Sequence, residues 1–318
     1  MESGDAERRG TGAIVVAGEA LVDLVFAESG ELVAHPGGGP FNAARAASRL
    51  GAPAHYLGCL SGDRFGAILR EALAADGVGL GTAVATDDPT TLALAEIGDD
   101  GSAAYRFYVE GTSAPGLTFP DAAAVLPADV AILCVGTLGL VFEPTAATLE
   151  RLVAEAGDEV LVAVDPNCRP AAIADPAAYR ARLERILRRA DVVKASAEDL
   201  AWLRPGAEVA DAIRTLLRPD GGAVGLVTLG AEGALVVTAT GAVAVAAPPA
   251  RVVDTIGAGD AFLGGLLSWW HGAGLGRGDV ADLPAVTEAT TYACRIAALT
   301  CERPGANPPH RDELPADA

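Results

Sequence analysis

Short apolar runs alternate along this chain with longer runs rich in alanine, leucine and arginine. Strand-like runs occupy residues 13–17, 54–59, 130–135, 160–164, 192–193, 224–228 and 234–237, and helix-like runs occupy 41–50, 65–75, 144–156, 177–189, 209–217, 258–270 and 284–300. Continuous apolar strands separated by helices are typical of a parallel sheet that is buried on both faces. The alternation therefore predicts an α/β fold in which helices cover both faces of a mostly parallel central sheet.

Two segments, 21–34 and 91–117, do not follow this alternation. Their strand-like residues are interleaved with charged or polar ones, as in the run from Tyr105 to Val109. We interpret both segments as parts of a small antiparallel β-sheet that forms a lid outside the main sheet. Because an exposed sheet has to be covered by substrate or by a second subunit, we expect a homodimer joined through the lids.

Length and composition narrow the possibilities. The 318 residues suffice for one large α/β domain, which we place at 13–310 between flexible tails at 1–12 and 311–318. The net charge of −19 disfavours nucleic-acid binding, which depends on neutralising phosphates. No apolar run reaches the roughly 18 residues of a membrane span, and the polar N-terminus shows no signal peptide. The five cysteines are scattered and form no disulfide pattern, which is typical of a reducing compartment. We therefore expect a cytoplasmic protein that binds neither nucleic acid nor membrane.

The run DTIGAGD, from Asp254 to Asp260, carries the strongest functional signal. An amphipathic helical pattern follows it, so Gly257, Ala258 and Gly259 lie at a helix N-terminus. Free backbone N–H groups bind anions there, and glycine lets a phosphate approach the backbone. A carboxylate at Asp260, beside such an anion site, suits a general base that takes a proton from a hydroxyl nucleophile. The same residues would also fit a glycine turn and a capped helix without a catalytic role.

Two further elements place polar groups near the same edge of the sheet. Gly37, Gly38 and Gly39 run into a helix with Asn42 in its first turn, which suits backbone N–H groups and an amide that contact sugar hydroxyls. Asp23 lies just beyond the first strand, and ligands of open α/β sheets bind at the carboxyl ends of strands. Its carboxylate would bridge two neighbouring hydroxyls. Taken alone, each element fits a simple turn or a solvated acid equally well.

Together, the glycine-rich element and the DTIGAGD element resemble the two signatures of the ribokinase-like (PfkB) carbohydrate kinases, and the resemblance extends from Ile14 to Pro309. It implies a three-layer α/β/α domain with a small β-lid, and a reaction in which ATP phosphorylates a sugar hydroxyl. It also implies that Asp260 is the catalytic base and that Gly257, Ala258 and Gly259 form the anion hole for the transferred phosphoryl group. The sugar-binding positions correspond to Asp23, Gly37, Gly38, Asn42 and Asp260.

The resemblance also implies positions for the nucleotide and for cations. The ATP side corresponds to the strand and turn from Thr228 to Gly233, and we assign to it Lys194, Ser196, Thr228, Gly230, Gly233, Gly257 and Gly259. A monovalent cation such as K⁺ corresponds to Asp254 and to the backbone of Ile256, Thr300 and Gly305.

Two departures from the family pattern affect these cations. Where many relatives have Asn-x-x-Glu, which organises Mg²⁺ through water, this chain has Ser196-Ala197-Glu198-Asp199. We therefore place Mg²⁺, through water, at Asp199, whose side chain is one methylene shorter than Glu. Pro309 stands where some members supply a hydroxyl to the monovalent cation, so a K⁺ site would depend on Asp254 and carbonyl groups.

The run from Asp165 to Pro170, DPNCRP, is similar to that of fructokinases and 2-keto-3-deoxygluconate kinases. Arg169 follows a predicted strand and Arg106 lies in the predicted lid, so we expect both to contact substrate. In the keto-acid kinases an arginine at the place of Arg169 pairs with the substrate carboxylate, whereas fructose offers none. We expect a fructokinase first, a 2-keto-3-deoxygluconate kinase second and a ribokinase or nucleoside kinase third.

Functions of other classes have less support. A non-catalytic sugar- or nucleotide-binding regulator on the same fold would not need Asp260 beside its glycine turn. A dinucleotide-dependent dehydrogenase would need a G-x-G-x-x-G motif, which Gly37–Gly39 does not form. An assay of ATP consumption across a panel of sugars, with NAD as a control, separates these classes.

Overall fold

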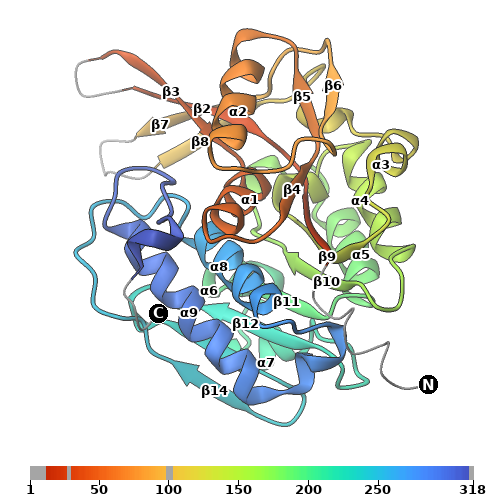
Figure 1. The fold of residues 1–318 in the computed structure, drawn as a ribbon, viewed down its shortest axis with the longest axis vertical. Coiled ribbons are helices and arrows are strands. Elements are labelled where there is room, and N and C mark those ends of the chain that lie inside the picture. The colour runs from red at the N-terminus through yellow and green to blue at the C-terminus, as the bar shows by residue number, and fades with distance from the viewer. Residues whose placement is uncertain (1–11, 27–29, 98–102, 315–318) are drawn as a thin grey trace.

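The main sheet of the molecule has eight strands and is mostly parallel. The computed structural model describes residues 12–26, 30–97 and 103–314. The strand order is β14-β13-β12-β11-β10-β9-β1-β4, and only the pairs β12–β13 and β13–β14 are antiparallel (Figure 1). These strands are β1 (Ala13–Ala17), β4 (Ala54–Leu57), β9 (Val130–Gly136), β10 (Leu161–Asp165), β11 (Val192–Ser196), β12 (Val224–Thr228), β13 (Ala234–Val237) and β14 (Ala242–Val245).

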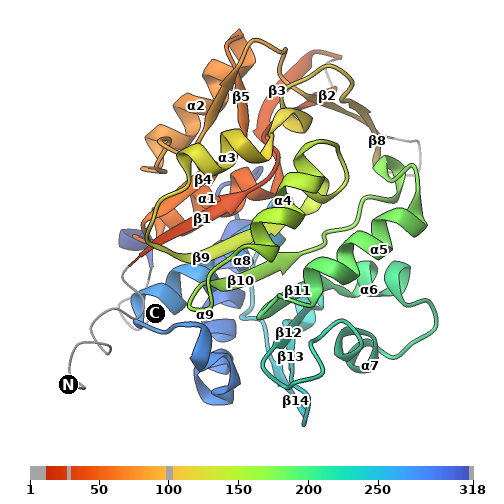
Figure 2. The ribbon, with the colours of Figure 1, turned by 90° about the vertical axis from the view of Figure 1, so that its right-hand side faces the viewer.

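Helices cover both faces of this sheet, as the sequence predicts. Alternate residues of β1 belong to different cores: Ile14 packs in the cluster of one face, and Val15 in that of the other. On the first face lie α1 (Gly39–Arg49), α2 (Arg64–Ala75), α8 (Ala258–Gly272) and α9 (Leu283–Cys301). On the second lie α3 (Phe119–Val125), α4 (Thr145–Ala154), α5 (Pro176–Leu187), α6 (Ala197–Leu203) and α7 (Val209–Arg214) (Figure 2). The three-layer α/β/α fold is confirmed.

A second, four-stranded sheet projects from the carboxyl edge of the main sheet, and we call it the lid sheet. It contains β2 (Leu21–Phe26), β3 (Leu32–Gly37), β7 (Leu92–Ile97) and β8 (Ala103–Tyr108), in the order β3-β2-β7-β8 (Figure 1). The prediction of an antiparallel lid is wrong for one pair, because β2 and β7 are parallel. The hairpins are β2–β3 and β7–β8. Their first strands, β2 and β7, leave the body in the same direction and are therefore parallel. A small sheet of β5 (Cys59–Ser61) and β6 (Val84–Thr86) lies nearby.

Some boundaries differ from the sequence expectation. No pattern predicted β14, α3 or α6, which are four and seven residues long and too short for a clear periodicity. Most of the expected tails lie outside the described residues, but Arg311–Glu313 form a 3-10 helix in which Glu313 accepts hydrogen bonds from Arg303. The first residues of the expected C-terminal tail thus contact the body of the domain. None of the described helices is long and apolar enough to cross a membrane.

The topology changes direction at β1. From this strand the chain proceeds to β4 on one side, whereas β9 to β12 follow on the other. Ligands of open α/β sheets bind outside the carboxyl ends of the strands at such a switch point. The fold therefore places a site between the ends of β1 and β9, below the lid sheet.

Candidate active site

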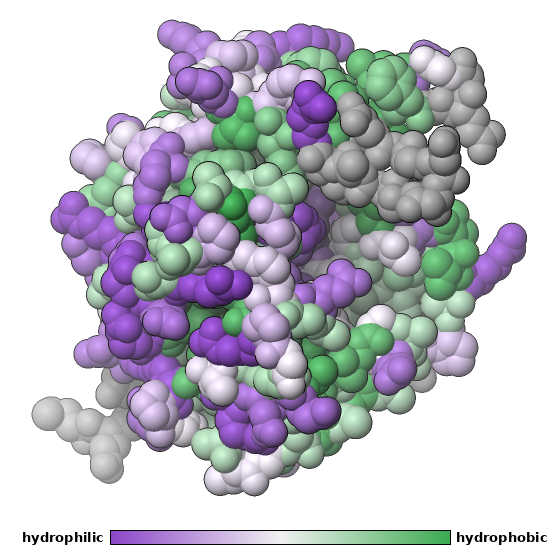
Figure 3. All heavy atoms as spheres, turned by 180° about the vertical axis from the view of Figure 1, so that it is seen from behind, coloured by the Kyte–Doolittle hydropathy of each residue, from purple (hydrophilic) through white to green (hydrophobic). Residues whose placement is uncertain are grey.

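A cavity of about 1010 Å³ occupies this position. The surface is hollowed between the lid sheet and the body of the molecule, and hydrophilic residues line the hollow (Figure 3). The predicted site residues that line the cavity are Asp23, Gly38, Asn42, Arg169, Lys194, Ser196, Asp199, Thr228, Gly230, Ile256, Gly257, Gly259 and Asp260. The structure thus brings together segments from across the chain.

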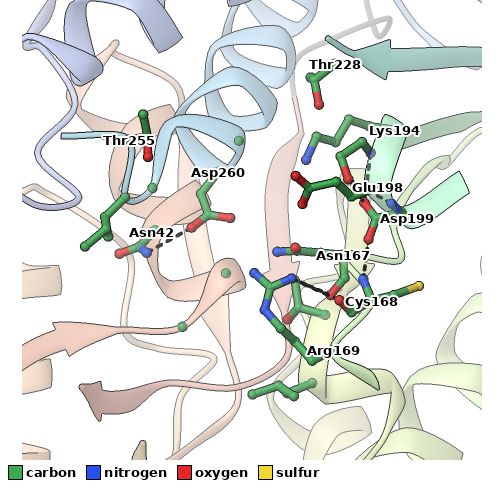
Figure 4. Close-up of a pocket in the computed structure, with 18 of the residues that line it drawn as sticks. Asn42, Asn167, Cys168, Arg169, Lys194, Glu198, Asp199, Thr228, Thr255 and Asp260 are labelled. Carbon is green, nitrogen blue, oxygen red and sulfur yellow. Dashed lines mark hydrogen bonds between the residues drawn. The ribbon is translucent and has the colours of Figure 1, made fainter. Parts of the chain in front are cut away.

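Asp260 lies in the first turn of α8 and points into the cavity (Figure 4). The amide of Asn42, in α1, donates a 2.9 Å hydrogen bond to Asp260 Oδ2. Burial raises the pKa of Asp260, while this bond and the charges of Lys194 and Arg169 oppose the rise. The Asn42 Oδ1 atom is buried and has no partner among the described residues, so it is available to a hydroxyl donor of a ligand.

The turn before Asp260 has the form of an anion site. Gly257 is the N-cap of α8 with φ of 74°, and a Cβ there would lie 2.5 Å from the Ala306 Cβ, so only glycine fits. The first N–H groups of a helix have no partner within the helix and lie at its positive end. Gly257 and Gly259 border the cavity, so these groups can receive the oxygens of a phosphate.

Asp23 and the glycine loop form the side of the cavity nearest the lid sheet. Burial and the charge of Asp260 raise the pKa of Asp23 to about 6, although Arg169 opposes the rise. Gly37 does not line the cavity, but a Cβ at this position would overlap the Asp23 carboxylate. Gly38 has φ of 112°, and its Cβ would lie 2.6 Å from the Glu19 carbonyl oxygen. The glycines thus let the backbone pass close to the acid that we expect to hold sugar hydroxyls.

Arg169 follows β10 in a strained loop. Asn167 has φ of 35°, which is unusual outside glycine, and it lines the cavity together with Arg169. The Arg169 guanidinium donates to the Cys168 carbonyl at 3.1 Å and to that of Asn167 at 3.3 Å. The positive charge of Arg169 partly offsets the rise that burial causes in the pKa of both Asp23 and Asp260. Arg169 is therefore close enough to act on both Asp23, on the predicted sugar side, and Asp260, the predicted catalytic base.

Lys194 is a buried cation on β11. Its Nζ donates a 2.7 Å bond to Asp165 Oδ2, and the two side chains are 4% and 2% exposed. Burial disfavours the charged ammonium of Lys194, but the Asp165 carboxylate outweighs this effect and raises the pKa of Lys194. Burial raises the pKa of Asp165. A Cβ at Gly259 would lie 3.1 Å from Lys194 Nζ. The ammonium therefore lies beside the glycine turn, where it can neutralise a phosphate. No sequence pattern identified Asp165 as its partner.

The rest of the predicted nucleotide side comes from the ends of β11 and β12. Ser196, Thr228 and Gly230 line the cavity, and Ser196 also caps α6. Gly233 lies outside the lining: it has φ of 100° and its Cβ would overlap the Val245 carbonyl, so glycine is required for the turn between β12 and β13. Its role is conformational.

A magnesium role does not fit Asp199, because its buried carboxylate already accepts three hydrogen bonds. Its Oδ1 accepts the Cys168 N–H at 2.6 Å, and its Oδ2 accepts the N–H and the hydroxyl of Ser196 at 2.8 and 2.7 Å. The residue is only 4% exposed. It therefore caps α6 and holds the loop that carries Arg169.

The segments expected around a monovalent cation do lie together. Asp254 Oδ1 accepts the Ile256 N–H at 3.0 Å, and Oδ2 accepts the Gly305 N–H at 2.8 Å. The N–H groups of Val253 and Asp254 donate to the Cys301 carbonyl, next to Thr300. One carboxylate and neighbouring carbonyl oxygens suit K⁺ in kind. No group of three or more His, Cys, Asp or Glu side chains within the described residues is arranged to hold a metal ion.

The strand register does not support the expected substrate contact of Arg106. Register places Asp23, Ala93 and Phe107 in one row across the lid sheet, and Arg106 in the next row. Because neighbouring residues of a strand point to opposite faces, Phe107 faces the cavity and Arg106 faces away. Phe107 indeed lines the cavity, and Arg106 does not. The strand alternation held the signal, but the face could be assigned only once the pairing was known.

Glu19 is a buried site residue that no sequence pattern singled out. It is 2% exposed, and its carboxylate accepts the N–H groups of Gly39 and Gly139 at 3.1 and 2.8 Å and the Thr137 hydroxyl. Burial raises its pKa to about 7, against these hydrogen bonds. Glu19 thus ties the start of α1 to the loop after β9. The only signal in the sequence is an acid directly after an apolar strand and a glycine.

Comparison with known proteins identifies the family. The family model described as pfkB family carbohydrate kinase matches residues 12–313. The chain belongs to this family. It is accordingly an ATP-dependent sugar kinase with the ribokinase-like fold.

Relatives of this pfkB kinase include several fructokinases. The fructokinase of Rhizobium leguminosarum bv. trifolii is 35% identical over 260 residues, which cover 80% of this chain and 78% of the relative. The structure of the Xylella fastidiosa fructokinase with bound ATP has a TM-score of 0.84 at 27% identity, covering 92% of this chain and 93% of that one. A double mutant of the Vibrio cholerae O395 fructokinase, with fructose, ADP and a potassium ion bound, has a TM-score of 0.80 at 27% identity, covering 94% of each chain.

Proposed function

We propose that this sugar kinase transfers the γ-phosphoryl group of ATP to fructose, with Asp260 as general base. The observation that carries the proposal is the position of Asp260 between the anion-binding turn of α8 and the polar groups Asn42 and Asp23, in one cavity. The fructokinase relatives support fructose as the sugar.

The proposed reaction uses these groups in order. Asp23, Asn42 and the backbone at Gly38 hold the sugar hydroxyls, and Asp260 takes the proton of the attacking hydroxyl. The oxygen of that sugar hydroxyl then bonds to the γ-phosphorus of ATP. At the same time the bond between the γ-phosphorus and the oxygen that bridges it to the β-phosphate breaks, and ADP leaves. The N–H groups of the glycine turn and the Lys194 ammonium stabilise the charge on the transferred group. Raised by burial, the pKa of Asp260 suits a base that must accept this proton.

The nucleotide and its cations occupy the other half of the cavity in this proposal. Ser196, Thr228 and Gly230 contact ATP at the ends of β11 and β12. Mg²⁺ would neutralise phosphate oxygens of the nucleotide. K⁺ would be held by Asp254 and the carbonyl groups of Ile256, Thr300 and Gly305, and would fix the turn that leads to α8. The potassium ion in the V. cholerae relative supports this assignment.

A 2-keto-3-deoxygluconate kinase is the second candidate, because the Arg169 guanidinium borders the sugar side and bonds only to two backbone carbonyls among the described residues. It could pair with a carboxylate of an acidic sugar.

Steady-state kinetics of the wild type and of Arg169→Ala separate the two candidates. With ATP, we expect higher kcat/KM for fructose than for 2-keto-3-deoxygluconate, ribose or a nucleoside, and little change in the fructose KM of the variant. Arg169 is exposed in the absence of substrate. If the keto acid is the substrate and covers Arg169 on binding, loss of the charged pair costs on the order of 2–5 kcal/mol, and the KM for the keto acid rises steeply in the variant. Activity confined to the keto acid would replace fructose as the substrate.

We also propose that the enzyme is a cytoplasmic homodimer joined through the lid sheets. Phe26, Leu32 and Tyr108 are 53%, 47% and 49% exposed. By register they belong to the same face of the lid sheet, the one opposite Asp23. Large apolar side chains gathered on one face are typical of a surface that is covered in the assembled protein.

A further inference from the structure

Glu198 is a free carboxylate on the proposed nucleotide side of the cavity. It lies in the first turn of α6, directly before the engaged Asp199, and it lines the cavity with an exposed side chain. Within the described parts of the chain, no hydrogen bond or ion pair involves this side chain. Figure 4 shows its carboxylate directed into the cavity toward Asp260, beside Lys194. Glu198 is thus one residue away from the position that the family pattern selects.

The negative charges around Glu198 favour the binding of a cation. Its carboxylate points toward Asp260, a second acid, across a cavity that Gly257 and Gly259 also line and in which phosphates would lie. Lys194 is already paired with Asp165. An unpaired carboxylate beside nucleotide phosphates repels them unless a cation stands between the two. Mg²⁺ suits this place, because it is usually bound by one or two carboxylates together with phosphate oxygens and water.

We propose that Glu198, and not Asp199, is the protein carboxylate that binds the hydrated Mg²⁺ ion of the magnesium–nucleotide complex. Asp199 keeps its structural bonds to Ser196 and Cys168. This inference rests on the proposed binding of ATP at the ends of β11 and β12. It assigns the metal contact to a residue that the Asn-x-x-Glu spacing does not select.

The test measures how strongly Mg²⁺ and ADP assist each other's binding, without sugar and without turnover. Isothermal titration calorimetry gives the Kd of ADP for the purified wild type in excess Mg²⁺ and in EDTA. The ratio of the two Kd values is the coupling between metal and nucleotide. The same ratio is measured for Glu198→Gln, for Asp199→Asn, and for Glu232→Gln as a matched control. Glu232 is another exposed carboxylate that lines the cavity, from the turn after β12.

We expect the coupling to fall at least about tenfold in Glu198→Gln, as for other residues that support a bound metal. The Kd in EDTA should stay the same or decrease, because a negative charge near the phosphates has been removed. Glu232→Gln should keep the wild-type coupling. Asp199→Asn should lower the melting temperature, because the cap of α6 is weakened. The fraction of this variant that folds should keep the wild-type coupling between Mg²⁺ and ADP.

Other results would overturn the assignment. Unchanged coupling in Glu198→Gln excludes the metal contact. If this variant binds ADP more weakly by the same factor in Mg²⁺ and in EDTA, Glu198 contacts the nucleotide itself. A loss of coupling confined to Asp199→Asn restores the family position. If the wild type binds no ADP under either condition, the proposed nucleotide site fails, which is a distinct outcome.

Discussion

Asp260 combines a buried carboxylate with a neighbouring anion site, and its charge can be removed without changing its shape. In Asp260→Asn the new side chain can still accept the hydrogen bond of Asn42. We expect ADP affinity to be retained and kcat to fall by about 10²–10⁴ or more, because a general base is lost. Steady-state kinetics and calorimetry on the same preparation measure the two effects. A variant with wild-type kcat would refute the assigned mechanism.

Asp23 shows how a charge that we propose to bind substrate weakens the fold. Its pKa is raised to about 6, chiefly by burial, so the charged form is less favourable in the folded protein than in the unfolded chain. The carboxyl therefore costs almost no stability below its unfolded pKa of about 4. Its destabilising effect grows as the pH rises from 4 to 6 and is complete above about 6. Asp23→Asn should unfold like the wild type near pH 4 and be more stable by about 1–2 kcal/mol near pH 8.

Denaturant unfolding at the two pH values measures this difference, and sugar titration should show weaker binding by the same variant. In the wild type, kcat/KM for the sugar should decline below about pH 6 as Asp23 becomes protonated. A variant that is less stable than the wild type near pH 8 would contradict the assignment of a desolvated carboxylate to this site.

Among the secondary-structure elements, the contact between α1 and α8 sets the geometry of the proposed catalytic site, because Asn42 and Asp260 come from these two helices. Gly264 lies at their interface, where a Cβ would lie 2.5 Å from the Ala46 Cβ and 2.7 Å from the Ala43 carbonyl oxygen. Gly264→Ala should destabilise the protein by about 1–3 kcal/mol, because the helices must separate. It should also lower kcat by lengthening the bond between Asn42 and Asp260.

Gly272, at the end of the same helix, is the matched control. It is exposed, and a Cβ there would meet no atom within 4 Å. Gly272→Ala should leave kcat unchanged and stabilise the protein by up to about 1 kcal/mol, because alanine favours the helix. Thermal melts and kinetics of both variants test the argument. Equal behaviour of the two variants would show that the interface does not control the site.

For the whole molecule, the proposed dimer can be broken at the lid sheet. Light scattering at micromolar concentration should give twice the chain mass for the wild type. Leu32→Asp should give the monomer, because a charge replaces an apolar side chain that the partner would cover. Val252→Asp, at an equally apolar residue that is 64% exposed outside the lid sheet, should remain dimeric. A wild type that is monomeric at this concentration would remove the proposal.

The sequence by itself determined the layers of the fold and the centre of the site. Strand-like and helix-like runs alternate, and this periodicity depends only on which residues become buried, so β1, β12 and β13 begin and end as predicted. The turn before Asp260 was equally accessible, because glycines and a helix start are local features. Family resemblance then joined Asp23, Asn42 and Asp260, and the structure places all three in one cavity.

Only the tertiary structure decided which polar groups are free and which are engaged. Asp199 and Glu198 are neighbours in the sequence, yet Asp199 bonds to Cys168, 31 residues away, whereas Glu198 faces the cavity. Lys194 likewise finds Asp165 on the neighbouring strand β10. A carboxylate can bind a cation only if its oxygens are not already saturated, and saturation depends on contacts between distant segments. That is why the spacing of residues located the site but could not show which acid is free to bind a metal.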